Sequence, residues 1–354
     1  MAPASQPGSD GFEGEVCVRT RAIYGCAGEV LSAEERAFFA DAQPWGFILF
    51  ARNVADPDQA RALVESLRQM VNDPMAPVLI DQEGGRVARL KPPHWKARPA
   101  AARFGALYVD NPEAAREATY LNARLMAAEL SALGVNVDCT PVLDVPVAGA
   151  DAVIGDRAFS HEPAVVIDLG RAVIQGMVDG GVLPVMKHIP GHGRAMADSH
   201  LALPRVATAA DSLSASDFVT FRSLNHCPLA MTAHVVYEAI DPQRPATTSP
   251  KLIRDVIRGE IGFDGLLLSD DLSMQALSGR LSARAKAALF AGCDIVLHCN
   301  GKMDEMREVA AEVTVLEDAA LKRAEAARAH LAEPEAFDCE RAEQRLADLL
   351  GALA

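Results

Sequence analysis

Short runs of aliphatic and β-branched residues alternate along the chain with longer stretches in which apolar residues recur at helical spacing. The short runs are apolar almost throughout rather than at every second position, which is typical of parallel strands buried on both faces. They are therefore strand candidates, and they cover residues 22–26, 47–50, 77–81, 135–140, 183–188, 229–234, 265–270 and 294–299.

Several of the helical stretches between these runs begin with a recognisable capping signal. Ser32 and Glu35 have the spacing of a capping box. Asp56 and Asn111 are each followed by proline, which is the pattern of an N-cap with proline at the first helical position. Ser249 repeats this pattern before the helix predicted at residues 251–261. Strands that alternate with helices in this way predict parallel βα units.

Eight strands separated by helices predict an α/β fold, a single (β/α)8 TIM barrel. An open doubly wound sheet is the structural alternative, and an irregular order of strands around the barrel is left open. The last stretch of about forty residues, rich in Ala, Glu and Arg, predicts one or two C-terminal surface helices. No boundary of a second domain is visible. We therefore expect one catalytic domain at residues 15–354, preceded by a flexible N-terminal leader at residues 1–14.

Composition and charge exclude several classes of protein. Half of the 354 residues are hydrophobic, so the chain can bury a large core. The net charge of −14 argues against a nucleic-acid or anionic-membrane partner, since both need a basic face. No apolar run reaches the ~18 residues of a spanning helix, and the leader lacks the regions of a signal peptide. Seven dispersed cysteines without a C-x-x-C pair favour free thiols in a reducing compartment. We expect a cytoplasmic protein.

Polar and ionisable residues follow most of the predicted strands at their carboxyl ends, which is where TIM barrels hold their active sites. One of these stretches continues into a loop that contains a carboxylate and an imidazole two residues apart. The stretches are Asp81-Gln-Glu-Gly-Gly-Arg-Val-Ala-Arg89, Lys187-His-Ile-Pro-Gly-His-Gly193 with Asp198-Ser-His200, Thr232-Ala-His234, Ser269-Asp-Asp-Leu-Ser-Met274 and His298-Cys-Asn300.

Each stretch has a structural explanation beside a chemical one. Asp81 could cap a turn, or it could accept hydrogen bonds from two adjacent hydroxyls of a polyol while an arginine nearby donates to a third. Lys187 could extend past the strand end toward water, donate to a ligand, or act as a Schiff-base nucleophile. Asp198 and His200 could form a proton-transfer dyad or remain uncoupled in a surface loop. Asp270 belongs to a carboxylate pair of which a strand end directs only one member into a pocket.

Together these stretches resemble the bacterial β-N-acetylhexosaminidases of glycoside hydrolase family 3. The resemblance extends from about residue 20 to residue 300, with four motifs in the order of the family. It departs mildly at Ile189, where phenylalanine is commoner, and in the segment 91–96. It implies a TIM barrel that removes terminal, non-reducing β-linked N-acetylglucosamine with retention of configuration.

The resemblance also implies roles for individual residues. Asp270 would be the nucleophile, and His200, oriented by Asp198, the general acid/base. The substrate would be a small molecule, N-acetylglucosaminyl-1,6-anhydro-N-acetylmuramic acid with or without its stem peptide, degraded during cytoplasmic cell-wall recycling. No metal or other cofactor is expected, and a monomer is favoured. The residues that would bind the sugar are Asp81, Arg89, Arg157, Lys187 and His188.

Three other functions stay open at this point. A Schiff-base aldolase could use Lys187, although it would leave the Asp198-Ser-His200 stretch and Asp270 without a role. A catalytically silent barrel could bind sugars without cleaving them. A metallo-hydrolase would use as ligands His188, His192, Asp198, His200 and His234. The absence of any H-x-H or H-E-x-x-H spacing counts against it.

Overall fold

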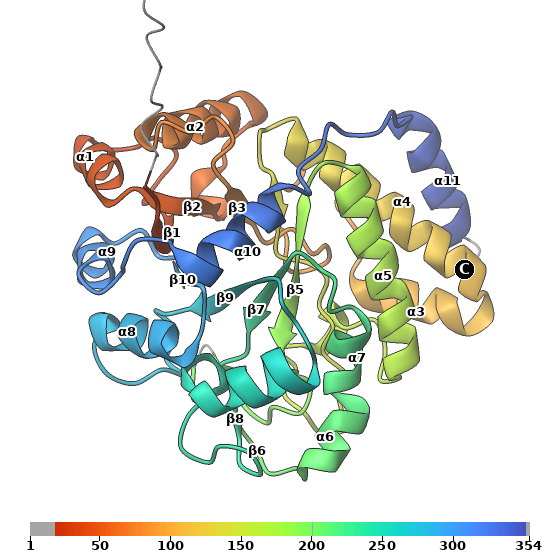
Figure 1. Ribbon diagram of the computed structural model, residues 1–354. Coiled ribbons are helices and arrows are strands. Elements are labelled where there is room, and N and C mark those ends of the chain that lie inside the picture. Colours follow the sequence, from red (N-terminus) through yellow and green to blue (C-terminus); the bar gives the residue numbers. More distant parts are fainter. Residues whose placement is uncertain (1–17, 200, 352–354) are drawn as a thin grey trace, which may run out of the picture.

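The computed structural model describes residues 18–199 and 201–351, so the leader predicted at residues 1–14 lies outside the described residues. Eight parallel strands pair side by side and close into a barrel (Figure 1). Each strand candidate overlaps one of them, and the closed barrel excludes the open sheet. The order is regular, so no irregular strand order occurs. The strands are β1 (Thr20–Gly25), β2 (Pro44–Leu49), β3 (Val78–Ile80), β4 (Val137–Asp138), β5 (Leu183–Ile189), β7 (Leu229–Thr232), β9 (Leu266–Asp271) and β10 (Ile295–His298).

Helices surround this barrel, as the alternating pattern predicts. Among the described residues, none of them combines the length and apolar character that a membrane span requires. Short 3-10 turns occur at η1 (Ala51–Asn53), η2 (Gly155–Arg157) and η3 (Ala246–Thr248), and η4 (Leu252–Glu260) is a π-helix. The remaining helices are α1 (Ala33–Ala42), α2 (Pro57–Met70), α3 (Ala101–Asp110), α4 (Pro112–Ser131), α5 (Pro163–Asp179), α6 (Ala210–Ser216), α7 (Phe218–Ser223), α8 (Leu281–Ala291), α9 (Met303–Ala310), α10 (Asp318–Arg328) and α11 (Cys339–Gly351).

The predicted capping signals start helices where the sequence places them. The hydroxyl of Ser32 accepts a hydrogen bond from the Glu35 N–H, and the Glu35 carboxylate accepts one from the Ser32 N–H. The Asp56 and Asn111 side chains cap α2 and α4, each before a proline. The Ser249 hydroxyl accepts from the first backbone N–H of η4. These local interactions satisfy donors that a helix start leaves without partners.

Strand side chains alternate between the barrel interior and the helices outside. Tyr24 and Phe47 point outward and pack against aromatic residues of α1. The interior is filled by layers of side chains, as is usual in this fold. They form one apolar cluster that includes Ile23, Ile48, Leu79, Val137, Val185, Leu229, Leu268 and Leu297.

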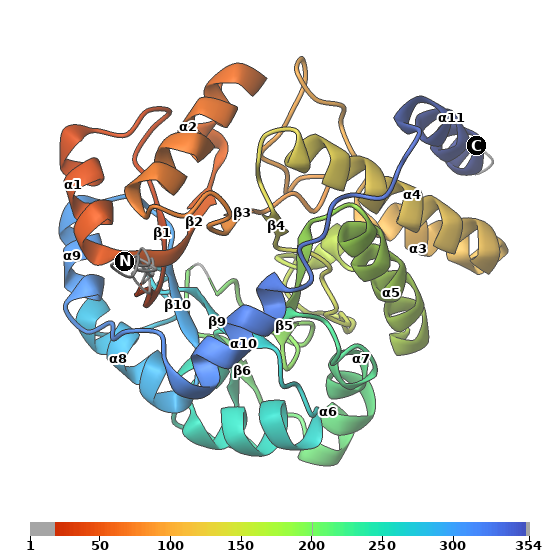
Figure 2. The same cartoon turned by 45° about the horizontal axis from the view of Figure 1, so that its top comes forward.

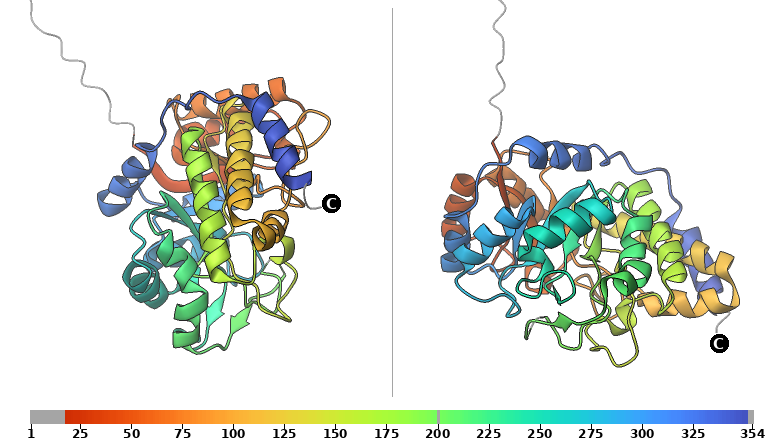
Figure 3. Two further views of the ribbon diagram at one scale, coloured as in Figure 1. Left: turned by 90° about the vertical axis from the view of Figure 1, so that its right-hand side faces the viewer. Right: turned by 60° about the horizontal axis from the view of Figure 1, so that its bottom comes forward.

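The two C-terminal helices have different roles. Helix α11 is a surface helix, as predicted, and lies beside α4 (Figure 3). Helix α10 crosses one end of the barrel (Figure 2) and adds Ala320, Ala324 and Ala327 to the interior cluster. Arg323 of α10 binds Asp264 and Asp294, which precede β9 and β10. Helix α10 therefore closes the amino-terminal end of the barrel instead of lying on its surface.

Two loops at the opposite, carboxyl-terminal end form a small sheet that no sequence pattern predicted. Its strands, β6 (Arg205–Val206) and β8 (Val236–Tyr237), pair in parallel and belong to the loops after β5 and β7. Each has only two residues, which is too short for a pattern of hydrophobicity to be visible. The pairing ties these two loops together above the barrel mouth.

Asp294 allows a test of how the closed end contributes to stability. Its side chain is 4% exposed and accepts hydrogen bonds from Arg258, from Arg323 and from the Leu267 N–H. Asp294→Ala leaves two guanidinium groups without their buried partner, so we expect the free energy of unfolding to fall by about 3 kcal/mol. Urea unfolding followed by circular dichroism measures this loss.

Asp264 provides the matched control, because it binds the same Arg323 guanidinium while being 88% exposed. Asp264→Ala should change the free energy of unfolding by less than about 1 kcal/mol. Equal losses in the two variants would contradict a specific role of the buried carboxylate.

Candidate active site

A cavity of about 390 Å³ opens at the carboxyl ends of the barrel strands. Its wall contains the carboxylates, cations and imidazole that the sequence singles out. A volume of this size is within the range of small-molecule sites. His200 lies outside the described residues. The predicted site residues on the wall are Asp81, Arg89, Arg157, Lys187, His188, Asp198 and Asp270.

A buried ammonium group lies between two carboxylates on one side of this cavity. Lys187, in β5, is 2% exposed, and its Nζ lies 2.8 Å from Asp81 Oδ1 and 2.6 Å from Glu83 Oε1. Asp81 Oδ2 also accepts a hydrogen bond of 3.0 Å from Arg89. The Arg89 guanidinium in turn lies over the ring of Phe50, 5.2 Å from its centre.

Glu83 joins a second cation to this cluster. Arg157, in η2, binds it with two parallel hydrogen bonds of 2.8 Å, the geometry in which a guanidinium and a carboxylate fit best. The sequence had placed Arg157 in the site but not Glu83. A signal for Glu83 was available, because it lies two residues after Asp81 in the same strand-end stretch.

The charges in this cluster fix each other's ionisation. Burial acts to raise the pKa of Asp81 and of Glu83, but Lys187 and the neighbouring arginines outweigh it and hold both pKa values below the usual range. Burial acts to lower the pKa of Lys187, and the two carboxylates raise it above the ordinary value. A Schiff-base nucleophile needs a neutral amine. The two carboxylates within 2.8 Å of Nζ favour the ammonium form of Lys187, which argues against the aldolase alternative.

A buried carboxylate absent from the predicted set organises the adjacent wall. Asp144, in the loop after β4, is fully buried, and its Oδ2 lies 2.7 Å from His188 Nδ1. Its Oδ1 accepts the backbone N–H groups of His188 at 3.2 Å and His192 at 2.6 Å. Burial opposes ionisation of Asp144, but the neighbouring imidazoles and these donors lower its pKa. Its position in a loop that follows a barrel strand was the one available signal.

Asp270 and Asp271, at the end of β9, have separate roles. The Asp271 carboxylate accepts hydrogen bonds from the Ser273 N–H at 3.0 Å and from the Cys299 N–H at 3.2 Å, so it holds a turn. Asp270 lines the cavity, and its Oδ1 accepts the Asp271 N–H at 2.8 Å. Both aspartates line the cavity, so the prediction that the strand end directs only one member of the pair into the pocket is wrong. Asp271 differs from Asp270 in that its carboxylate holds the turn through the Ser273 and Cys299 N–H groups.

The loop that carries Asp198 is attached to the cavity wall next to that residue. Ser199 Oγ lies 3.0 Å from Nε2 of the buried His192. The Ser199 carbonyl also accepts the Ala276 N–H at 3.2 Å. Burial, followed by the neighbouring His188, lowers the pKa of His192 to about 4, so its ring is neutral near neutral pH.

The described residues do not support a metal centre. Among them, no group of three or more His, Cys, Asp or Glu side chains is arranged to hold a metal ion. His234, one of the five ligands that the metallo-hydrolase alternative needs, has both ring nitrogens engaged. Its Nδ1 lies 2.7 Å from Thr247 Oγ1, and its Nε2 lies 3.0 Å from the Asp271 carbonyl oxygen.

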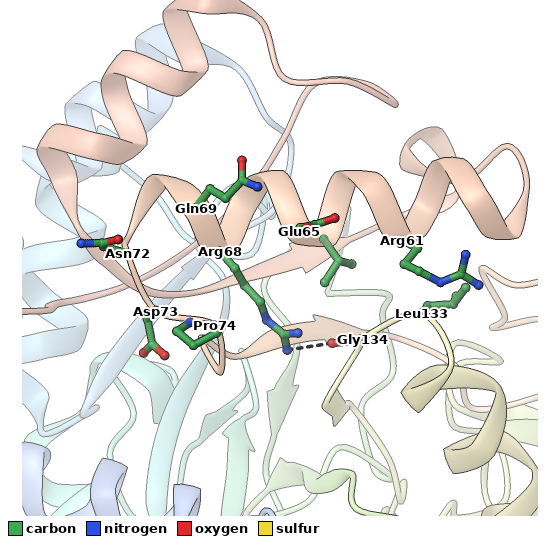
Figure 4. Close-up of a pocket in the computed structure, with 10 residues that line it drawn as sticks. Arg61, Glu65, Arg68, Gln69, Asn72, Asp73, Pro74, Leu133 and Gly134 are labelled. Carbon is green, nitrogen blue, oxygen red and sulfur yellow. Dashed lines mark hydrogen bonds between the residues drawn. The ribbon is translucent and has the colours of Figure 1, made fainter.

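A larger hollow of about 510 Å³ lies between α2 and the loop after α4 (Figure 4). Arg68 crosses it and donates a hydrogen bond of 2.7 Å to the Gly134 carbonyl. Its other lining includes Asp73 and Pro74, which precede β3, while Gly134 precedes β4. It is therefore at the amino-terminal end of the barrel, opposite to the end where this fold performs chemistry.

Comparisons with known proteins identify the family of this chain. Residues 21–332 match the Glycosyl hydrolase family 3 N terminal domain. The chain is 45% identical over 282 residues to a beta-hexosaminidase of Alkalilimnicola ehrlichii, which covers 78% of this chain and 80% of the relative. It is 42% identical over 282 residues to a beta-hexosaminidase of Methylococcus capsulatus, with 78% and 82% covered.

Solved structures of similar enzymes superpose on most of this chain. Native NagZ from Neisseria gonorrhoeae superposes with a TM-score of 0.82 at 33% identity, over 94% of this chain and 98% of that one. NagZ of the same organism in complex with N-trifluoroacetyl-D-glucosamine superposes with a TM-score of 0.85, at the same identity and coverage.

The ion cluster predicts how stability depends on pH. Because the pKa of Glu83 is lowered on folding, its contribution is complete above the unfolded value of about 4.3 and is lost as the pH falls through the folded value. In Glu83→Gln, the free energy of unfolding should therefore fall less steeply below about pH 4 than in the wild type. Chemical unfolding at several pH values measures both slopes. A variant slope equal to that of the wild type would contradict the coupling.

Proposed function

Since the chain belongs to glycosyl hydrolase family 3 and is a β-N-acetylhexosaminidase, we propose that it cleaves terminal β-N-acetylglucosamine with retention, using Asp270 as nucleophile. The observation that carries this proposal is the position of Asp270 at the end of β9. Its carboxylate lines the cavity that also contains the Asp81, Glu83 and Lys187 cluster. A carboxylate aimed into a sugar-binding cavity is what an oxocarbenium-like transition state requires.

In the first step, Asp270 attacks the anomeric carbon and forms a glycosyl ester, while the bond to the leaving oxygen breaks. His200 donates its proton to that oxygen. In the second step, His200 takes a proton from water, which attacks the same carbon and releases Asp270. Two displacements at one carbon give retention.

We assign the acid/base role to His200 and the orienting role to Asp198. An imidazole with an ordinary pKa of ~6.5 can both donate and accept a proton near neutral pH. Asp198 lies on the cavity wall, two residues before His200 in the chain. A carboxylate next to an imidazole fixes its tautomer and favours its protonated form. Ser199, between them, attaches this part of the loop to His192.

The sugar would be held by the cluster on the other side of the cavity. Asp81, whose ionised carboxylate accepts from Lys187 and Arg89, would also accept from sugar hydroxyl groups. Lys187, Arg157 and His188 supply donors whose positions are fixed by buried carboxylates. The complex of the Neisseria gonorrhoeae NagZ with N-trifluoroacetyl-D-glucosamine supports an amino sugar as the ligand of this cavity.

We propose N-acetylglucosaminyl-1,6-anhydro-N-acetylmuramic acid, with or without its stem peptide, as the natural substrate. The enzyme would act as a monomer in cytoplasmic cell-wall recycling. A histidine acid/base suits this leaving group because a neutral imidazole, unlike a second carboxylate, does not repel the muramyl carboxylate. Similarity to NagZ from Neisseria gonorrhoeae supports this choice.

Retention can be observed directly. During hydrolysis of this disaccharide or of an aryl β-N-acetylglucosaminide, proton NMR should show the β anomer of N-acetylglucosamine first, followed by slow mutarotation. Initial release of the α anomer would contradict a covalent intermediate and, with it, the role of Asp270.

The two proposed catalytic residues should differ in how leaving groups affect their variants. Asp270→Ala should lower kcat/KM by about 10⁴-fold or more for every substrate, because the attacking group is lost. His200→Ala should lower it by ~10²–10⁴-fold for a phenyl glycoside. For a dinitrophenyl glycoside, whose leaving group needs little protonation, its loss should be far smaller. Steady-state kinetics with both substrates measure this difference, and equal losses in His200→Ala would exclude it as the acid.

A further inference from the structure

Three buried polar side chains lie directly behind Asp270 and have no role in the reaction described above. Thr232 ends β7, His234 follows it by two residues, and Thr247 lies in η3. All three are 0% exposed. They connect strand β7 to the end of the neighbouring strand β9, where Asp270 and Asp271 are located.

The direction of each hydrogen bond in this group follows from its chemistry. The Asp271 carbonyl can only accept, so the proton of His234 must be on Nε2, 3.0 Å away. Burial lowers the pKa of His234, and a neutral ring protonated at Nε2 has an acceptor at Nδ1. The Thr247 hydroxyl, 2.7 Å from Nδ1, must then be the donor.

The remaining links are determined in the same way. The hydroxyl of Thr247 also lies 3.2 Å from the Ala233 carbonyl, but its shorter contact is with the imidazole. The single proton of the Thr247 hydroxyl is therefore donated to His234, so Thr247 can only accept from the Thr232 hydroxyl, at 2.8 Å. Thr232 Oγ1 in turn accepts the Asp270 N–H at 3.4 Å, the weakest link of the set.

These bonds form a closed ring around the backbone that carries Asp270. The ring starts at the N–H of Asp270, runs through Thr232, Thr247 and His234, and ends at the carbonyl of Asp271. All bonds point in one direction, so each hydroxyl donates once and accepts once. Removal of one hydroxyl would leave two buried groups without partners, which is costly in a dry interior.

The ring holds the backbone at Asp270, whose side chain must be placed accurately for the proposed attack. Asp270 Oδ1 accepts the Asp271 N–H at 2.8 Å, so the carboxylate is oriented by the same peptide segment. The Asp271 carboxylate holds the turn on the other side through Ser273 and Cys299. A misplacement of a reacting group by about 1 Å can reduce a rate by about 10²-fold.

We propose that Thr232, Thr247 and His234 are positioning residues, whose hydrogen-bonded ring sets the place of the Asp270 carboxylate for attack on the anomeric carbon. This inference rests on the proposed role of Asp270 as nucleophile. It gives His234 a task that requires a neutral, immobile ring. Substitutions in the ring should thus slow the formation of the glycosyl ester for good and poor leaving groups alike.

Thr247→Val tests this inference, because it removes the hydroxyl and keeps the shape. Thr247→Ser retains the hydroxyl and serves as the conservative variant. Thr220→Val is the matched control: Thr220 is also fully buried, and its hydroxyl donates 2.9 Å to the Leu143 carbonyl. Four quantities are measured for each variant: the melting temperature, kcat and KM with phenyl and dinitrophenyl glycosides, and the rate of covalent labelling by a slow fluorinated glycosyl donor.

We expect Thr247→Val to lose about 10-fold to 10²-fold in kcat and in labelling rate with both leaving groups, at little change in KM. Thr247→Ser should keep most of the activity. Thr220→Val should lose melting temperature to a similar extent and keep kcat. Thr232→Val provides a second variant in case Thr247→Val does not fold. In the double variant with both substitutions, the two losses in kcat should not multiply, because each substitution breaks the same ring.

The inference is overturned if folded Thr247→Val or Thr232→Val labels at the wild-type rate, or if Thr220→Val loses as much kcat as they do. Asp270→Ala separates this result from a failure of the proposed function. Labelling of Asp270→Ala at the wild-type rate would refute Asp270 as the nucleophile, and the positioning role would fall with it. Absence of label in Asp270→Ala, together with normal labelling in Thr247→Val, refutes the ring alone.

Discussion

The ammonium group of Lys187 is the charge on which the active site depends. A lysine that is 2% exposed is tolerated only with partners, because removal of one ion from water costs several kcal/mol. Asp81 and Glu83 supply the opposite charge from the loop after β3, while Lys187 belongs to β5. The ion cluster therefore ties two strand ends across the barrel mouth. Arg157 extends it to the loop after β4, so three separate segments share one arrangement of charge.

One end of the barrel contributes mainly to stability, and the other end carries the site of the proposed chemistry. At the amino-terminal end, α10 seals an apolar interior, and Asp294 joins Arg258 and Arg323 there. At the carboxyl-terminal end, polar groups are packed around the cavity, and several of them are held by a second buried group. Asp144 holds His188, and the ring through Thr232 and His234 holds the backbone of Asp270. Rigid supports of this kind keep reacting groups in place without movement during the reaction.

The sequence predicted the fold well because local signals determine it. Apolar runs marked all eight barrel strands, and capping residues such as Ser32 and Asn111 marked helix starts. The predicted site residues that are described lie around one cavity, while His200 is not among the described residues. Asp144 was missed because its contact with His188 spans 44 residues of chain, and such pairings leave no local pattern. Helix α10 was placed on the surface because its small alanines resemble those of an exposed helix.

The central claim, that Asp270 becomes bonded to the sugar during the reaction, can be tested by mapping the covalent intermediate. The wild-type enzyme is incubated with a slow fluorinated N-acetylglucosaminyl donor, digested, and analysed by peptide mass spectrometry. The account predicts a single added glycosyl group on the peptide that contains Asp270, with fragment ions that place it on that residue. A label on Asp81, on Asp198 or on any other side chain would contradict it.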